Sequence, residues 1–327
     1  MATLKDVAKQ AGVSASTVSY VFNGKKTVRA ETAKRIFDAI EDLGYHPNLA
    51  ARSLKTNQTR SVGIVVADFS NIFYIDVLSG IERRVAQGGH SSIVCNSRNS
   101  AQTEFENLRS LVERNVDGIL LLGTGHNTTK TIGELTVPVV SVDRIPHRVT
   151  NTVSIDNVKG GYLGARYLLD KGLKNITFIG FNEQLSSRDR RQGCLNAYAD
   201  AKIDPTDHFR YVETDISPEA GYRLATEIVG GRPRRAVEAI FAGTDYVAFG
   251  VLKALSDLGL SVPGDVAVVG YDDLLLSQFT TPGLTTIRQP AELMGEQAAD
   301  MLLRLLAKEP VRERVRLQPS LVVRDSA

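Results

Sequence analysis

Apolar residues follow two different patterns along the chain, one up to about residue 60 and another from residue 61 to the end. In the longer part, short apolar runs such as SVGIVVA and VDGILLLG alternate with amphipathic stretches of helical length. The runs are typical of buried strands, and the longer stretches are typical of helices. Because strands that alternate with helices form parallel sheets with crossover connections, this part is predicted to be an α/β domain.

The α/β pattern occurs twice, and the change falls near Asp156. We expect strands at SVGIVVA, SSIVCN, VDGILLLG and PVVSVD before this point, and at NITFIG, FRYVET, AIFAGT and DVAVVGYDD after it. Helices are expected at IFYIDVLSGIERRVAQGG and QTEFENLRSLVERN, and then at about 157–171, 189–202, 217–229, 245–258 and 290–307. Two successive runs of this kind predict two similar lobes with doubly wound parallel sheets that face each other across a cleft.

The first 46 residues show only the helical pattern. Thr3 and Ser14 can cap two short helices, and a third helix is expected from about Arg29 to Leu43. Gly12 lies between the first two helices, where the chain must turn tightly. Two short helices joined in this way and supported by a third make a helix-turn-helix. The predicted domains are a helix-turn-helix head at 1–46, a hinge helix or linker at 47–60, and a two-lobed body at 61–327.

Residues 1–60 and the rest of the chain also differ in net charge. The net charge of the whole chain is +2, but residues 1–60 hold ten Lys and Arg against five Asp and Glu, so they carry +5 and the remainder −3. The second helix is expected to turn its valines toward the core and to leave Ala15, Ser16, Ser19 and Tyr20 outward. Small hydroxyl side chains at a helix N-terminus can enter the major groove of DNA and reach phosphates or base edges. A basic head of this kind indicates a DNA partner.

The composition, 43% hydrophobic and 23% charged, is that of a globular protein with a full core. No apolar run approaches the roughly 20 residues needed to cross a bilayer. The N-terminal residues MATLKDVAKQAG lack the apolar segment of a signal peptide. Cys95 and Cys194 are far apart, and we expect both to be reduced thiols. These features predict a cytoplasmic protein with no membrane partner and no metal site.

The motifs of common enzymes with doubly wound sheets are incomplete in this chain. GTGHNT at 123–128 has Thr128 where a dinucleotide-binding loop needs its last glycine, and NGKKT at 23–27 lacks the first glycine of a phosphate-binding loop. The sequence contains neither a G-x-S-x-G elbow nor an H-E-x-x-H motif, and its five histidines are scattered. We therefore expect no catalytic activity.

The head sequence TLKDVAKQAGVSASTVSYVFNG, followed by VRAETAKRIFDAIEDLGYHPNLAARSLKTNQT, resembles the lactose/galactose repressor family of bacterial transcription regulators. The body extends the resemblance in VDGILLL, VPVVSVD, TDYVAFG, VPGDVAVVGYDD and LTTIRQP, which are similar to the effector domain of that family and hence to periplasmic sugar-binding proteins. The resemblance implies a DNA-binding set made of Thr3, Ser14, Ala15, Ser16, Thr17, Ser19, Tyr20, Asn23, Arg29, Ala51, Arg52, Leu54 and Lys55. Within this set, Ala15, Ser16 and Tyr20 would read the bases.

A short alanine-rich segment, residues 48–54, follows Pro47 and has the pattern of a helix that is too short to be stable alone. By resemblance it is a hinge helix that folds only on DNA, paired in the minor groove with its twin from a second subunit. Leu54 would then wedge between central base pairs, and Arg52 and Lys55 would lie near phosphates. The alternative is a plain linker between domains.

Polar side chains follow the predicted strands of the body, where folds of this type bind their ligands. Carboxylates accept hydrogen bonds from hydroxyls, arginine donates them, and aromatic rings cover apolar faces, so this set suits a polyhydroxylated ligand. Carried over by resemblance, the effector pocket contains Phe73, Asp143, Arg190, Thr244, Asp272 and Gln289. Asn71 and Tyr74, which follow the first predicted strand, complete the predicted set.

The same positions also have structural interpretations. Asp143 and Asp272 can cap turns, Arg190 can pair with a surface carboxylate, and the two aromatic residues can belong to the core. Asp245 and Asp273 are expected to be structural rather than ligand-binding.

We expect a dimeric, ligand-controlled repressor of genes for carbohydrate uptake or catabolism, with a sugar or sugar derivative as effector and no cofactor. Two heads would place their recognition helices in successive major grooves of a palindromic operator. The resemblance implies a dimer contact along residues 75–85, and the C-terminal RLQPSLVVRDSA has no heptad pattern for a tetramer. Two alternatives stay open: a regulator of the same fold that responds to a purine or another metabolite, and a solute-binding receptor, which would require a signal peptide.

Overall fold

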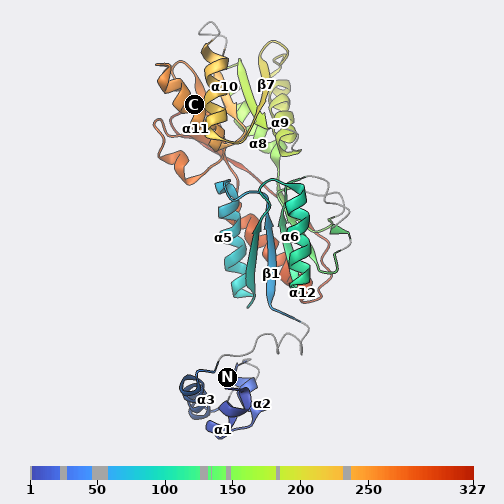
Figure 1. Cartoon of the computed structure of the whole chain (residues 1–327). Coiled ribbons are helices and arrows are strands. Elements are labelled where there is room, and N and C mark those ends of the chain that lie inside the picture. The colour runs from blue at the N-terminus through green and yellow to red at the C-terminus, as the bar shows by residue number, and fades with distance from the viewer. Residues whose placement is uncertain are drawn as a thin grey trace. The chain divides into compact units, whose positions relative to one another are not determined.

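The computed structural model describes residues 2–22, 28–45, 58–125, 132–133, 135–144, 149–181, 185–230 and 237–327 (Figure 1). Contacts divide the chain into two compact units, Met1–Thr59 and Arg60–Ala327. The predicted hinge lies outside the described residues up to residue 57. The small unit holds the predicted head, and the large unit holds the two-lobed body.

The described part of the small unit consists of the helices α1 (Leu4–Gln10), α2 (Ala15–Phe22) and α3 (Ala30–Leu43). A capping box begins α1: Thr3 Oγ1 accepts from the Asp6 amide at 3.3 Å, and Asp6 Oδ2 accepts from the Thr3 amide at 2.8 Å. Gly12 has a φ of 63° in the turn between α1 and α2, a conformation that glycine adopts without strain. Val18 of α2 and Ile36 of α3 are fully buried with residues of α1, so one core holds the three helices together.

The first lobe of the large unit is built on a parallel sheet with the strand order β11-β5-β4-β3-β1-β2. The strands are β1 (Ser61–Val66), β2 (Ser91–Asn96), β3 (Gly118–Leu122), β4 (Val139–Val142), β5 (Thr152–Ile155) and β11 (Arg314–Leu317). Successive side chains of β1 face opposite sides of the sheet. Ile64 packs with α5 (Ile72–Gln87) and α12 (Ala291–Leu306), whereas Val65 packs with α6 (Ala101–Glu113). Helices therefore cover both faces.

The second lobe repeats this plan with the strand order β12-β10-β9-β8-β6-β7. Its strands are β6 (Ile176–Phe181), β7 (Phe209–Thr214), β8 (Ala239–Ala242), β9 (Ala267–Asp272), β10 (Thr285–Arg288) and β12 (Ser320–Val322). Its helices are α8 (Asn157–Asp170), α9 (Leu185–Ala201), α10 (Pro218–Gly230), α11 (Asp245–Asp257) and the 3₁₀ helix η1 (Leu275–Gln278). In β6, Phe178 faces the cluster formed with α8 and α9, and Ile179 faces the cluster formed with α10 and α11.

The chain passes between the lobes at three places within its described residues. β5 leads into α8 through Asp156, β10 leads into α12 through Gln289 and Pro290, and β11 leads into β12 through residues 318–319. Figure 1 shows the result, with α12 returning to the first lobe after most of the second lobe is complete. The second lobe is thus inserted between parts of the first, and three short segments connect them.

This architecture confirms the predicted fold class, a helix-turn-helix head with an α/β body of two doubly wound lobes. β12 is an exception to the parallel arrangement, because it pairs antiparallel with β10. The reason is that β12 enters its sheet from the first lobe, whereas β10 runs toward that lobe. α9 begins at Leu185 rather than at the predicted residue 189, and the short strands β5, β10, β11 and β12 were not predicted.

Glycines let three pairs of helices pack with their backbones in contact. A Cβ atom at Gly161 in α8 would lie 1.9 Å from the backbone oxygen of Arg190 in α9, and one at Gly193 would lie 2.0 Å from the oxygen of Val158. The same close approach occurs between α5 and α12 and between α10 and α11, at Gly80, Gly295, Gly221 and Gly250. Only a residue without a side chain fits at these contacts, which fix α9, and with it Arg190, against α8.

Candidate functional site

The outward face of the head begins with a row of hydroxyl groups on α2. Ser14 Oγ accepts from the Thr17 amide at 3.1 Å and lies 2.7 Å from Ser16 Oγ and 2.8 Å from Thr17 Oγ1. Tyr20 follows one turn later and is 41% exposed. Amides and hydroxyls at a helix N-terminus suit the phosphate backbone of a nucleic acid, and an exposed phenol can reach a base edge.

Ala15 departs from the expected outward orientation. It is half-buried and packs against the core of the head, because the first turn of α2 lies close to α1. Ser19 is also half-buried, whereas Ser16 is exposed as expected. The outward surface of α2 is therefore made mainly by Ser16 and Tyr20 in its described residues.

The head also carries exposed basic residues on α1, on α3 and just before α3. In its described part they are Lys5, Lys9, Arg29, Lys34 and Arg35. Thr3 is occupied with the cap of α1, and its hydrogen bonds hold the pKa of Asp6 below its ordinary value. The predicted DNA-binding residues Asn23, Ala51, Arg52, Leu54 and Lys55 lie outside the described residues.

A cavity of about 300 Å³ lies between the two lobes of the body. Its wall is formed by residues that follow strands β1, β2, β3, β4 and β7, together with the end of β6 and the first turns of α5 and α11. The lining residues are Asp68, Ser70, Asn71, Tyr74, Asn99, Thr124, Arg144, Phe181, Thr214, Asp215, Ile216 and Tyr246. The site is therefore where the carboxyl ends of parallel strands from both lobes meet.

Asp68 and Asn71 shape the first-lobe wall of the cavity. Asp68 accepts from the Ser70 amide at 3.0 Å and from Asn99 Nδ2 at 3.0 Å, which ties the loops after β1 and β2 together. Asn71 caps α5 by accepting from the Phe73 amide at 3.1 Å. These contacts hold both hydrogen-bond donors and hydrogen-bond acceptors at the wall, and a ligand with several hydroxyl groups requires both.

Tyr74 and Arg144 lie side by side in this wall. The Tyr74 hydroxyl donates to Asp143 Oδ2 at 3.5 Å, and burial raises the pKa of Tyr74, so it stays a hydrogen-bond donor at neutral pH. Arg144 Nη1 donates to the carbonyl oxygen of Thr124, whose amide donates to the buried carboxylate of Glu104. Among the described residues, nothing accepts a hydrogen bond from Arg144 Nε. Arg144 therefore lines the cavity and keeps one buried donor without a partner among the described residues.

Arg190 lies behind Phe181 and is only 4% exposed. Its Nε donates to Asn157 Oδ1 at 2.8 Å, and its Nη1 donates to the Gly243 oxygen at 2.6 Å. The guanidinium carbon is 3.6 Å from the centroid of the Tyr271 ring and 5.6 Å from that of Phe181. A buried cation is thus held by two acceptors and two aromatic faces.

Asp272 and Gln289 form a second buried pair, at the end of β9 and at the crossover after β10. Gln289 Nε2 donates to Asp272 Oδ1 at 2.6 Å. Burial raises the pKa of Asp272 well above its ordinary value, and the neighbouring charge of Arg190 opposes this shift. In the part of the chain that the structure describes, Gln289 Oε1 has no hydrogen-bond partner. Asp272, one of the predicted effector residues, is therefore joined directly to a segment that connects the lobes.

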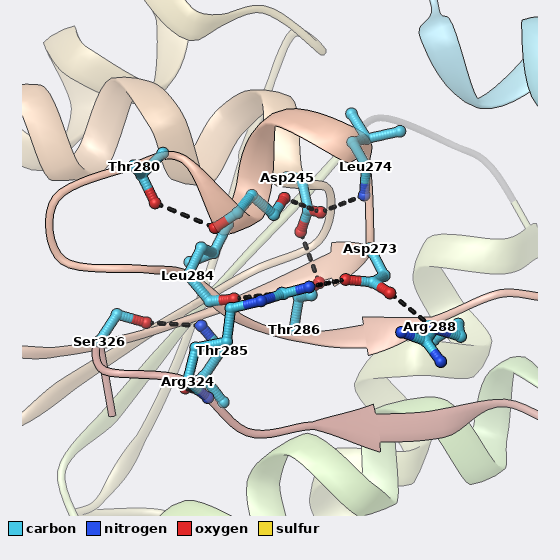
Figure 2. Close-up of polar contacts among 11 residues, drawn as sticks. Asp245, Asp273, Leu274, Thr280, Leu284, Thr285, Thr286, Arg288, Arg324 and Ser326 are labelled. Atoms are coloured by element: carbon cyan, nitrogen blue, oxygen red, sulfur yellow. Dashed lines mark hydrogen bonds and ion pairs between the residues drawn. The ribbon is translucent and has the colours of Figure 1, made fainter.

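Asp245 and Asp273 are fixed in a network of their own (Figure 2). Asp273 accepts from Arg288 Nε and from Arg324 Nη2, each at 2.6 Å, and so points away from the pair made by its neighbour Asp272. Asp245 is fully buried, and its burial raises the pKa of the carboxyl group while three hydrogen-bond donors lower it. Both carboxyl groups are used by the protein itself.

Of the eight predicted effector residues, Asn71 and Tyr74 line the cavity. Asp143 contacts Tyr74, and the buried residues Arg190, Asp272 and Gln289 lie in the layer behind the wall. Two others have structural roles: Phe73 belongs to the core of the first lobe, and Thr244 caps α11 by accepting from the Val247 amide at 3.3 Å. The remaining wall residues were not in the predicted pocket.

Their positions carry a usable signal in the sequence. Thr124 lies two residues after β3, Arg144 two residues after β4, and Asp215 directly after β7. Ligands in such folds bind beyond the carboxyl ends of strands. This rule selects these three residues when it is applied to every strand, without the family resemblance.

The described residues contain no cluster of histidine, cysteine, aspartate or glutamate that could hold a metal ion. Among the same residues, every helix is too short or too polar to cross a membrane.

Comparisons with known proteins agree with this arrangement. Residues 3–48 match the pattern of bacterial regulatory proteins of the lacI family, and residues 165–327 match a periplasmic binding protein-like domain. The chain is 36% identical to the HTH-type transcriptional repressor PurR of Proteus mirabilis, over 100% of this chain and 97% of that protein. It is 38% identical to the ribose operon repressor of Escherichia coli, over 100% of both.

Among solved structures, the chain is similar to a lac repressor dimer bound to operator and the anti-inducer ONPF. The TM-score is 0.86 and the sequence identity 28%, over 99% of this chain and 98% of that one. The likeness includes the head and both lobes.

Proposed function

The chain belongs to the lacI family of bacterial regulatory proteins, whose members matched here are transcriptional repressors rather than enzymes, and from this we propose that it is a homodimeric repressor controlled by a sugar. It acts in the cytoplasm on a palindromic operator. A small-molecule effector bound between the lobes changes its affinity for that operator. The domains that carry these roles are the head at 1–46, the hinge at 47–60 and the body at 61–327.

Operator binding is supported by the exposed face of α2. Ser16 and Tyr20 point to solvent from a helix whose N-terminal hydroxyls and amides suit phosphate oxygens. We assign base reading to these two residues with Ala15, and backbone contacts to Thr3, Ser14, Thr17, Ser19, Asn23 and Arg29. In the hinge, Leu54 is assigned to the minor groove together with Ala51, Arg52 and Lys55. A palindromic site then requires two heads, one from each subunit.

The cavity between the lobes is the observation that carries the effector assignment. Its wall offers carboxylate, amide, hydroxyl and guanidinium groups from both lobes, so a ligand with many hydroxyls can satisfy all of them at once. Tyr74, Phe181 and Tyr246 add apolar surface for the face of a sugar ring. The relative in Escherichia coli is named for the ribose operon, which supports a pentose as the first candidate.

A purine or another flat metabolite is the second candidate. The same three aromatic residues offer ring faces on which a base can stack. The two classes differ in what they require of the polar wall, because a sugar uses acceptors such as Asp68 along its whole edge and a purine does not.

We assign the transmission of the effector signal to the three segments that connect the lobes. Gln289 lies in one of them and binds Asp272, so a ligand that draws the lobes together acts on that segment. A change in lobe closure alters the spacing of the two heads and hence the pairing of the hinges. The two binding events are then coupled reciprocally. The dimer is assigned a first-lobe contact along residues 75–85 of α5, where Ile75 is exposed.

A thermal-shift titration of the full chain tests the effector assignment. A ligand at about one hundred times its dissociation constant adds roughly 2.7 kcal/mol of stability. A stabilising pentose or hexose supports the sugar assignment, and a response to purines alone overturns it. Adding the stabilising ligand to a complex with fluorescent operator DNA then measures its effect on DNA binding, and an unchanged affinity would contradict control by that effector.

A further inference from the structure

The strand β11 gives the first lobe a basic edge, although the body as a whole carries a net charge of −3. Arg314 and Arg316 lie in this strand, and Arg312 lies two residues before it. All three residues are exposed, and Arg316 Nη1 lies 3.9 Å from Asp156 Oδ2. The function proposed above uses none of these cations. We call Arg312, Arg314 and Arg316 the arginine edge.

The acids next to the arginine edge in the sequence do not neutralise it. Glu309 and Glu313 both pair with Arg304 of α12, at 3.1 Å and 3.0 Å. Within the described part of the chain, neither Arg312 nor Arg314 forms an ion pair. These two cations are therefore available to an anionic group from outside the protein.

The backbone of β11 is open on its outer side. β11 is the last strand of its sheet, and it pairs with β5 alone among the described strands. The carbonyl oxygens of Glu313 and Leu317 accept from amides on the β5 side, each at 3.0 Å. Because alternate residues of a strand direct their backbone groups to opposite sides, the N–H and C=O groups of Arg314 and Arg316 point away from β5. The edge thus offers both donors and acceptors to a further strand.

The side chains of β11 divide between the two faces of the sheet. Arg314 and Arg316 lie on one face. Val315 and Leu317 are half-buried on the other face, where they pack against the core of the first lobe. A strand beside β11 continues both faces, so acidic side chains suit the positions next to the arginines and aliphatic side chains suit the positions next to Val315 and Leu317.

We propose that the arginine edge binds an extended segment of a partner protein in which acidic and aliphatic residues alternate, and that this segment joins the first-lobe sheet as a strand beside β11. Addition of a strand satisfies the open backbone groups, and opposite charges across the pair select the partner. A segment of about six residues, the usual length of a strand, covers the edge. The contact needs neither operator nor effector, so it is independent of the function proposed above.

Two other occupants fit the arginine edge less well. A nucleic acid offers phosphate oxygens to the arginines, but a phosphate accepts hydrogen bonds and has none to donate to the outward carbonyl groups of Arg314 and Arg316. A second copy of the chain would bring β11 against itself across a two-fold axis and would place like charges opposite each other. An acidic strand satisfies the donors, the acceptors and the charges together.

A synthetic peptide tests the contact by fluorescence anisotropy. The probe is fluorescein-labelled Glu-Val-Glu-Ile-Glu-Val-Glu, and it is titrated with the full chain. The control peptide, Glu-Glu-Val-Ile-Val-Glu-Glu, has the same composition and charge without the alternation. The alternating peptide is expected to bind at least about tenfold more tightly at the same ionic strength, because it alone sets every acid on one face of a strand.

Arg314→Glu and Arg312→Glu each place a like charge next to the probe, and each is expected to raise its dissociation constant at least about tenfold. Arg109→Glu is the matched control, since Arg109 is an exposed arginine on α6 of the same lobe and the change alters the net charge equally. It is expected to change the constant by less than about twofold. Melting temperatures establish that each variant is folded, and Arg314→Gln, which removes only the positive charge, replaces a glutamate variant that is not.

Hydrogen exchange measures the backbone pairing itself. The alternating peptide is expected to slow exchange of the Arg314 and Arg316 amides at least about tenfold. The Val315 amide already faces β5, so its exchange is expected to change little. Unchanged exchange at Arg314 and Arg316 would show that no strand is added.

Three further results would overturn the proposal. Equal binding of the two peptides would show an attraction between charges without strand addition. Absence of binding of the alternating peptide at about 1 mM would show that the arginines only keep other strands away from this edge. If Arg314→Glu weakens binding of labelled non-operator DNA and leaves peptide binding unchanged, the arginine edge is a nucleic-acid contact instead.

Discussion

The guanidinium carbon of Arg190 lies 3.6 Å from the centroid of the Tyr271 ring, while the same group donates hydrogen bonds to Asn157 and to the Gly243 oxygen. A planar cation held on one face and along one edge has a single orientation. Arg190 is therefore already ordered in this structure, so a role in effector binding would require no further ordering of its side chain.

Arg190→Lys should abolish the response to the effector and leave effector-free operator binding within about twofold. An ammonium group cannot reproduce the planar contact with Tyr271 or reach both acceptors. Fluorescence anisotropy with labelled operator, with and without the ligand found by thermal shift, measures this. Arg188→Lys is the control, because Arg188 is exposed and only two residues away. A normal response in Arg190→Lys would remove this residue from the effector site.

Asp272→Asn should weaken the pH dependence of stability. Burial raises the pKa of Asp272, so the folded state holds its proton more tightly than the unfolded state does. The stabilisation is complete below the ordinary pKa of an aspartate and is lost as the pH rises through the raised value. Asparagine cannot ionise, so the variant should be more stable than the parent at pH 7.

Chemical denaturation of both proteins at pH 4.5 and pH 7 measures that difference. Asp215→Asn serves as the control, since Asp215 is exposed on the same cavity wall. A difference between Asp272→Asn and the parent that is the same at both pH values would contradict the prediction.

Gly161→Ala should destabilise the body by about 3 kcal/mol or more. The added methyl group would lie 1.9 Å from the backbone oxygen of Arg190, and overpacking against a backbone cannot be relieved by a side-chain rotation. Gly230→Ala is a matched control at the end of α10, where nothing lies within 4 Å of the added atom. Thermal unfolding should show a large loss for the first variant and little change for the second, and equal effects would contradict the close packing of α8 with α9.

Tyr20→Ala should weaken operator binding by about 1–3 kcal/mol without altering the fold of the head. Its side chain is 41% exposed, so little packing is lost with it. Phe37→Ala is the control, because Phe37 is an exposed aromatic residue of the same head that lies on α3. Anisotropy titrations that found equal losses for both variants would show that α2 has no special part in DNA binding.

The fold was predictable because its signals are local. Buried strands such as Val62–Val66 are continuous apolar runs, and helix starts such as Thr3 and Ser14 are marked by the side chains that cap them. Short strands escaped prediction, namely β5, β10 and β11 with four residues each and β12 with three. The antiparallel pairing of β12 depends on where the chain re-enters the lobe, which no local pattern records.

The candidate site was predictable only in part, because it depends on which side chains reach the cavity. The resemblance selected Phe73, but the ring turns into the core of the first lobe. It passed over Arg144, which stands next to the selected Asp143 and does line the cavity. Whether a residue beyond a strand faces a ligand or the core is decided by tertiary packing, and a single sequence does not contain that information.

The glycine contacts between helices have a mechanical consequence. α5 with α12, α8 with α9, and α10 with α11 are joined backbone to backbone, at Gly80, Gly161 and Gly221 among others. Interiors packed this closely do not deform gradually. Each lobe therefore behaves as a rigid body, and any bending between the lobes is concentrated in the three short connecting segments. We therefore expect the connecting segments, and not deformation of the lobes, to set how far the lobes can move relative to each other.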